Sequence, residues 1–126
     1  LKEAVQLEID RFNRLQFINS HLEIIGTSKK IDEKSSIIIF RILQEFFSNT
    51  IKHSKASNLF IVLEYSDTHL LVTAKDDGVG FATEGKKEGI GLINIKNRAK
   101  LIGAEAIFTS EEQKGTMLQI HYKYII

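Results

Sequence analysis

The spacing of the apolar residues changes along this chain of 126 residues, and that change limits the possible folds more than any other feature. In the first fourteen or so residues, apolar side chains recur every three or four positions, which predicts an amphipathic helix. They are Leu1, Val5, Ile9 and Phe12. Further on, Ile18, Leu22 and Ile24 alternate with polar residues, which predicts a strand ending at Gly26. Helical and extended segments therefore alternate from the start.

The middle of the chain continues this alternation. Asp32 is a suitable N-cap for a long helix, which we expect to extend to about His53. Residues 59–65 and 70–75 are rich in β-branched and aromatic side chains and flank a polar turn. These two segments therefore predict a hairpin.

The last part of the chain begins with a glycine-rich, polar stretch from Asp76 to Gly91. The helical spacing that follows ends at Gly103, a residue suited to a helix C-terminus. Two further strands are expected at about 105–110 and 116–124. Helices interleaved with hairpin-connected strands predict an α/β (α+β) fold over residues 1–126, a two-layer α/β sandwich with the helices on one face.

The composition excludes several classes of function. The chain has 17 basic and 16 acidic residues, and this near-even balance provides no strong field to attract nucleic acid or a membrane surface. The absence of cysteine excludes disulfides and thiolate metal sites and suits a cytoplasmic protein. Charged and polar residues interrupt the most apolar stretch, so we expect no membrane-spanning segment here. Because the helical pattern is already present at Leu1, we expect the chain to be part of a longer one.

Four polar residues of the long helix lie within one arc of its circumference. They are Glu45, Asn49, Lys52 and His53. One interpretation is a solvated helix face. The other is a metal–phosphate site, because an asparagine carbonyl is a hard oxygen ligand suited to Mg²⁺ and is here in line with an acid and a cation. The residues alone leave both interpretations open.

The end of the second hairpin strand carries the sequence Asp76-Asp77-Gly78-Val79-Gly80-Phe81. Asp-Gly at a strand end is a common turn signal, so a simple tight turn is one interpretation. A turn needs one glycine, however, whereas glycines at 78 and 80 would let the backbone come close to a ligand. A carboxylate at a strand end can also accept a hydrogen bond from an exocyclic amine such as that of adenine.

Two weaker signals follow. Gly89-Ile90-Gly91-Leu92 opens the last helix, and a glycine-flanked helix N-terminus suits phosphate. The chain has neither the third glycine of a dinucleotide fingerprint nor the Gly-Lys-Ser/Thr of a Walker A loop. Gly115-Thr116 lies between the two closing strands and by itself predicts only a hairpin.

The order and spacing of these four segments resemble the Bergerat-fold ATPases, which include gyrase-type topoisomerases, heat-shock chaperones and histidine kinases. Segment 45–53 resembles the N box, 76–80 the G1 box, 89–92 the G2 box and 115–116 the terminal Gly-Thr pair. The residues of the N box and of the last helix, together with a lid of only seven residues between G1 and G2, are similar to those of the short-lid subclass of sensor histidine kinases. That resemblance implies a mixed, mostly antiparallel sheet.

The resemblance also implies roles for the N box, with Mg²⁺ and ATP as cofactors. Asn49 would ligate Mg²⁺, and Lys52 would contact phosphate oxygens. His53 would line the nucleotide wall, although a helix-end histidine favoured by the dipole is an equal alternative. Glu45 would be the catalytic residue, which orients or deprotonates the attacking imidazole.

The other boxes would complete the nucleotide site. By resemblance, Asp76 would accept a hydrogen bond from the adenine amine, with Thr116 supporting the base beside it. Gly78 and Gly80 would admit the nucleotide. Backbone N–H groups of the G2 box would bind phosphate; this box comprises Gly89, Gly91 and Leu92.

None of the four histidines has the sequence context of a phosphoacceptor, which is an acidic residue directly after the histidine on an exposed helix. The resemblance therefore implies two partners, a dimerisation domain that carries the acceptor histidine and a response regulator with a helix-turn-helix output domain. Any membrane segment would lie upstream, and this domain would be cytoplasmic. The alternatives are an anti-sigma-factor serine kinase and a non-catalytic partner-binding module.

Overall fold

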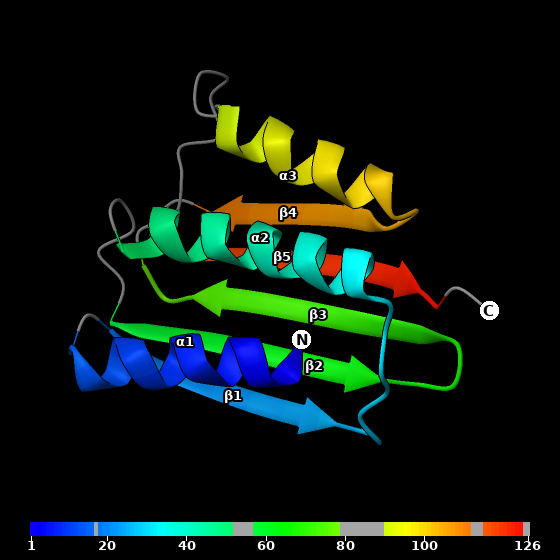
Figure 1. Ribbon diagram of the computed structural model, residues 1–126. Helices are drawn as coiled ribbons and strands as arrows, with labels where there is room; N and C mark the ends of the chain where they lie inside the picture. The colour runs from blue at the N-terminus through cyan, green and yellow to red at the C-terminus, as the bar shows by residue number, and fades with distance from the viewer. Residues whose placement is uncertain (17, 52–56, 79–89, 112–114, 125–126) are drawn as a thin grey trace.

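The computed structural model describes residues 1–16, 18–51, 57–78, 90–111 and 115–124. Three helices and five strands follow one another in the order α1 (Lys2–Arg14), β1 (Asn19–Ile25), α2 (Glu33–Asn49), β2 (Asn58–Tyr65), β3 (His69–Asp76), α3 (Ile90–Leu101), β4 (Glu105–Glu111) and β5 (Gly115–Lys123) (Figure 1). Each of these elements was predicted from the sequence, with boundaries that differ by a few residues.

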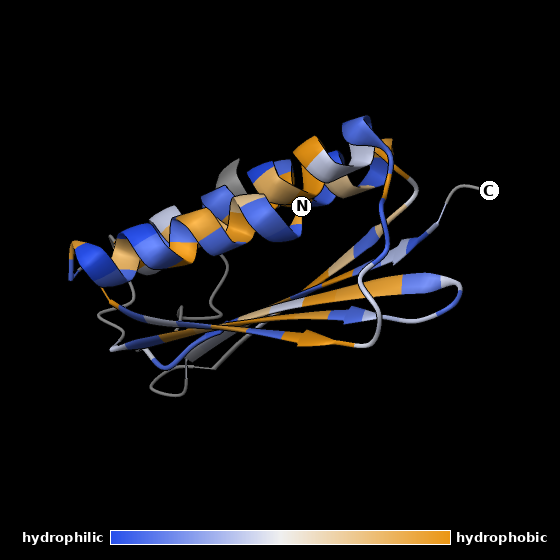
Figure 2. Cartoon of the chain, turned by 60° about the horizontal axis from the view of Figure 1, so that its bottom comes forward, coloured by the Kyte–Doolittle hydropathy of each residue, from blue (hydrophilic) through white to orange (hydrophobic). Residues whose placement is uncertain are grey.

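The strands form one sheet in the order β1-β2-β3-β5-β4. β1 pairs with β2 in parallel, and the three other pairings are antiparallel. α1, α2 and α3 lie together on one side of this sheet (Figure 2). The mixed, mostly antiparallel sheet and the two-layer α/β sandwich are both confirmed.

The core fills the space between the helices and the sheet. α1 contributes Val5, Ile9 and Phe12 to the core, at the helical spacing seen in the sequence. The Phe12 ring meets the Phe47 ring edge to face with centroids 5.5 Å apart, which joins α1 to α2. None of the described helices is long and apolar enough to cross a membrane.

The N-terminus of α2 is fixed by hydrogen bonds to its own cap and to the sheet. The Asp32 carboxylate accepts a hydrogen bond from the Ser35 backbone N–H at 3.1 Å, which confirms Asp32 as the N-cap. The Tyr122 hydroxyl of β5 donates to Asp32 Oδ1 at 2.9 Å and lies 2.9 Å from Ser35 Oγ. Hydrogen bonds from Ser35 and then from Tyr122 lower the pKa of Asp32 below its ordinary value.

The α-helical part of α2 ends earlier than the predicted position near His53. Asn49 is its last residue and Thr50 is its C-cap. The backbone takes a wider, π-type turn at Thr50 and Ile51. Such turns often lie at functional sites. Residues 52–56 lie outside the described part of the chain.

A side chain of α1 completes the backbone pairing of β1 at one point. β1 is an edge strand, so one of its sides has no neighbouring strand. There the Asn13 amide donates to the Ser20 carbonyl at 2.9 Å and accepts from the Ser20 N–H at 2.7 Å. The Asn13 side chain thus takes the place of a paired strand at Ser20 and protects the edge at that point.

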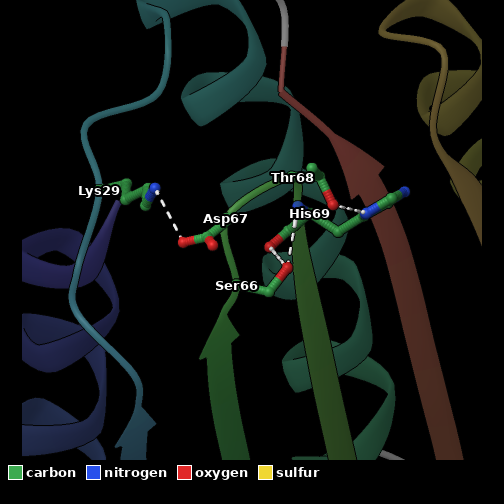
Figure 3. A network of polar contacts seen from close by, with 5 residues as sticks. All are labelled: Lys29, Ser66, Asp67, Thr68 and His69. Atoms are coloured by element: carbon green, nitrogen blue, oxygen red, sulfur yellow. Dashed lines mark hydrogen bonds and ion pairs between the residues drawn. The ribbon is translucent and has the colours of Figure 1, made fainter.

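The β2–β3 turn has its own polar network at the opposite end of the sheet from Asp76 (Figure 3). Ser66 Oγ accepts from the His69 N–H and donates to the His69 carbonyl, both at 3.0 Å. Thr68 Oγ1 lies 2.6 Å from His69 Nδ1. Lys29 lies 3.8 Å from Asp67, a surface ion pair that contributes little to stability. The Ser66–His69 hydrogen bonds close the turn between β2 and β3.

Candidate functional site

The segments singled out in the sequence meet at one end of the sandwich. The C-terminal ends of α2 and β3 lie there with the N-terminal ends of α3 and β5 (Figure 1). Antiparallel pairing places Asp76, the last residue of β3, opposite Thr116 near the start of β5. Two residues that are distant in sequence therefore become direct neighbours at this end.

Asp76 is a buried carboxylate with a fixed orientation. Only 1% of its surface is exposed. Its Oδ1 accepts from the Gly78 N–H at 2.9 Å, and its Oδ2 accepts from the Thr50 hydroxyl at 3.0 Å. A carboxylate has about four acceptor positions, so both oxygens retain capacity for a ligand donor.

Gly115 explains how β5 comes so close to Asp76. Its φ of +90° is a left-handed conformation that favours glycine. A Cβ at this position would lie 2.2 Å from the Asp76 carbonyl oxygen. No other residue fits there without moving the strand that carries Thr116, which is 4% exposed.

The Asp77 carboxylate is hydrogen-bonded to residues at the start of β2. Its Oδ1 accepts from the backbone N–H groups of Ser57 and Asn58, and its Oδ2 from the Asn58 amide, all at 2.8 Å. Desolvation raises the pKa of Asp77, but the hydrogen bonds from Asn58 and Ser57 outweigh it and leave the pKa below its ordinary value. Asp77 therefore ties the end of β3 to the start of β2.

Glu45 and Asn49 lie one helical turn apart on α2, and both are partly buried. Residues four apart project from the same side of a helix, so their oxygens can act on the same ligand. The described residues contain no group of three or more His, Cys, Asp or Glu side chains that could hold a metal ion. The side-chain oxygens of Glu45 and Asn49 suit Mg²⁺, which is commonly bound through one or two protein oxygens, substrate phosphates and water.

The remaining predicted residues are placed less completely. Gly91 and Leu92 lie in the first turn of α3, where backbone N–H groups have no partner within the helix. Lys52, His53, Gly80 and Gly89 lie outside the described residues.

Sequence reasoning missed the role of Thr50. Thr50 follows Phe46 by four positions and Phe47 by three, so it faces the same side of α2 as these buried rings. A hydroxyl on the apolar side of a helix needs a polar partner, and this signal is present in the sequence. The sequence pattern indicates only a turn at Asp77, because its bonds to a distant strand leave no local signal.

Comparison with known proteins identifies the protein family to which the chain belongs. Residues 34–125 match the model of the histidine kinase-, DNA gyrase B- and HSP90-like ATPase family. The chain therefore belongs to this family, as the four boxes predicted.

The individual relatives are sensor histidine kinases. The chain is 35% identical over 123 residues to the sensor histidine kinase LiaS of Bacillus subtilis, covering 95% of this chain and 33% of LiaS. It is 35% identical over 97 residues to the histidine-protein kinase/phosphatase DegS of Brevibacillus brevis, covering 76% of this chain and 25% of DegS. The chain thus spans a quarter to a third of these relatives.

A solved structure shows the same fold. The histidine kinase AdeS of Acinetobacter baumannii superimposes with a TM-score of 0.75 at 22% identity, over 99% of this chain and 65% of that one. This superposition confirms the fold, and the family match together with the named relatives confirms the resemblance to a histidine kinase ATP-binding domain. The short-lid subclass and its type of response regulator stay predictions.

Proposed function

We propose that this chain binds Mg²⁺–ATP and donates the γ-phosphoryl group to a histidine on a separate dimerisation domain. The observation that carries the proposal is the Asp76 carboxylate. It is buried, held at both oxygens by protein donors and adjacent to Thr116. An acceptor fixed in this way is suited to the exocyclic amine of adenine, with Thr116 supporting the base.

The phosphate side of the proposed site lies along α2 and α3. Asn49 would ligate Mg²⁺, which when bound offsets the charge of the phosphate oxygens. Gly91 and Leu92 would offer first-turn N–H groups to phosphate. The family resemblance alone assigns Lys52 to phosphate and His53 to the nucleotide wall. It likewise assigns Gly78 and Gly80 to backbone that admits the nucleotide, and Gly89 to the phosphate-binding G2 box.

The transfer requires a nucleophile from outside this chain. A bond forms between a ring nitrogen of the acceptor and the γ-phosphorus, and the bond to the β,γ-bridging oxygen breaks, so ADP leaves. Glu45 would orient the acceptor imidazole or take its proton. His21 and His121 lie on strands and His69 begins β3, so none of these three has the helical setting of an acceptor.

The proposed partners follow from this division of labour. The dimerisation domain would supply the histidine, and a response regulator would receive the phosphoryl group from it in the cytoplasm. The names of the curated relatives support a histidine kinase over an anti-sigma-factor serine kinase or a non-catalytic module.

The proposal is tested through Asp76. Asp76→Asn keeps the shape of the side chain but offers an N–H where the amine needs an acceptor, so ATP affinity should fall about 5- to 150-fold. GTP carries a carbonyl at that position and should compete poorly with ATP on the wild type. Titration calorimetry with both nucleotides measures these affinities. Equal displacement of a fluorescent ATP analogue by GTP and ATP would contradict the adenine role.

A further inference from the structure

Thr50 joins the end of α2 to the proposed base-binding carboxylate. Its side chain is 2% exposed and lies beside the buried face of α2 formed by Phe46 and Phe47. Its hydroxyl donates to Asp76 Oδ2 at 3.0 Å. The two residues are 26 positions apart, so this contact exists only in the folded chain.

We propose that Thr50 is a positioning residue for base selection, because its hydroxyl holds the Asp76 carboxylate in the orientation that reads the adenine amine. This inference rests on the proposed function, in which Asp76 binds that amine. The Gly78 N–H fixes one carboxylate oxygen and Thr50 fixes the other. Two donors on opposite oxygens set the plane of the carboxylate before any ligand arrives, which lowers the entropy lost on binding.

The same residue links the two halves of the site. Thr50 is the C-cap of α2 and directly follows Asn49, the proposed magnesium ligand. Asp76 belongs to β3 in the sheet. The Thr50 hydroxyl therefore links the helix end that carries the proposed magnesium ligand to the strand end that carries the proposed base-binding carboxylate.

A purely structural role would have a different signature. If Thr50 only satisfied a buried carboxylate, its loss would destabilise the fold and weaken every nucleotide by a similar factor. If Thr50 orients the Asp76 carboxylate, its loss weakens the binding of nucleotides that carry the amine and leaves the binding of nucleotides without the amine unchanged. The ratio of two affinities therefore separates the two roles.

The experiment compares ATP with inosine triphosphate, which has a carbonyl oxygen in place of the amine, by titration calorimetry on the 126-residue chain. Thr50→Val keeps the β-branched shape and removes the hydroxyl. We expect this variant to bind ATP about 5- to 30-fold more weakly, with inosine triphosphate affinity within about twofold of the wild type. Thr50→Ser restores the hydroxyl and should recover most of the preference for ATP.

Ser35→Ala is the matched control, because it removes a buried hydroxyl from the other end of α2. It should lower the unfolding temperature and leave the ATP to inosine triphosphate ratio unchanged. Equal weakening of both nucleotides by Thr50→Val, or no weakening, overturns the inference while the proposed function stands. A wild type with no preference for ATP, or an Asp76→Asn variant that keeps it, overturns the adenine role of Asp76 and this inference together.

Discussion

At the scale of single residues, two adjacent carboxylates differ in their burial and in their hydrogen-bond partners. Asp76 is buried and faces the proposed nucleotide site. Asp77 is exposed, and its hydrogen bonds go to Ser57 and Asn58 at the start of β2. This Asp-Asp pair therefore combines the proposed adenine-binding carboxylate with a carboxylate that ties together the neighbouring strand ends.

Removal of Asp77 should reduce stability. Asp77→Ala loses three hydrogen bonds and should lower the free energy of unfolding by about 1 kcal/mol, since the group is exposed and each bond contributes little. Asp77→Asn keeps an oxygen for the two backbone N–H groups and should lose less. Urea unfolding at neutral pH measures both. Equal stability of the alanine variant and the wild type would contradict the role of Asp77.

The site is predictable where the relevant residues are close in sequence. The spacing within the N and G1 boxes is enough to identify Asn49 and Asp76 as candidates from the sequence alone. Thr50 and Asp77 were missed because their partners lie 26 positions away and 19 or 20 positions away, and local patterns contain no information on such contacts. Gly115 indicates only a turn in the sequence, because the close approach of the Asp76 carbonyl is a property of the folded sheet.

At the scale of elements, α2 is attached to the sheet at both of its ends. Asp32 and Ser35 meet Tyr122 of β5 at the N-terminus, and Thr50 meets Asp76 of β3 at the C-terminus. Hydrophobic spacing predicted where this helix lies, because its buried face repeats with the helical period. Its α-helical part ends at Asn49 and continues as a π-type turn at Thr50 and Ile51, and the predicted end near His53 lies outside the described residues.

The cap of α2 should make stability depend on pH. The pKa of Asp32 is lowered in the folded chain, so the unfolded chain binds the proton more tightly. The stabilisation is then complete above the ordinary value of 3.8 and is lost as the pH falls through the lower folded pKa. Asp32→Asn keeps a capping oxygen but cannot titrate there. Urea unfolding from about pH 6 to about pH 3 should show wild type and variant converging as the pH falls; a constant difference would contradict this assignment.

At the scale of the whole molecule, the proposed nucleotide site lies at one end of the sandwich, and in the proposed function the nucleophile comes from another domain. The described helices cover one face of the sheet, and the functional segments gather where α2, α3, β3 and β5 have their ends (Figures 1 and 2). The fold class was predictable from the alternation of periods. The four distant segments come together at one end because of the strand order, and the hydrophobic periodicity alone does not predict that order.

The proposed separation of the ATP site from the acceptor histidine predicts the behaviour of the chain in labelling experiments. With γ-labelled ATP alone, it should take up almost no acid-labile phosphate. Mixed with a separately produced dimerisation hairpin from its own full-length protein, it should label that hairpin slowly, because the step has become bimolecular. Glu45→Gln should slow labelling while ATP affinity stays nearly unchanged. Strong phosphohistidine on the 126 residues alone would contradict the proposal, and phosphoserine on an added protein would favour the serine kinase.

The β2–β3 turn offers a place to attach a spectroscopic probe. Asp67 is fully exposed, and its ion pair with Lys29 is long (Figure 3). The eight residues of β3 separate this turn from the site around Asp76, a distance of about 25 Å along an extended strand. The chain contains no cysteine, so Asp67→Cys would carry the single reactive thiol. A dye on that thiol and a fluorescent nucleotide would form an energy-transfer pair whose separation lies in the measurable range, so occupancy of the site could be followed without altering any residue near it.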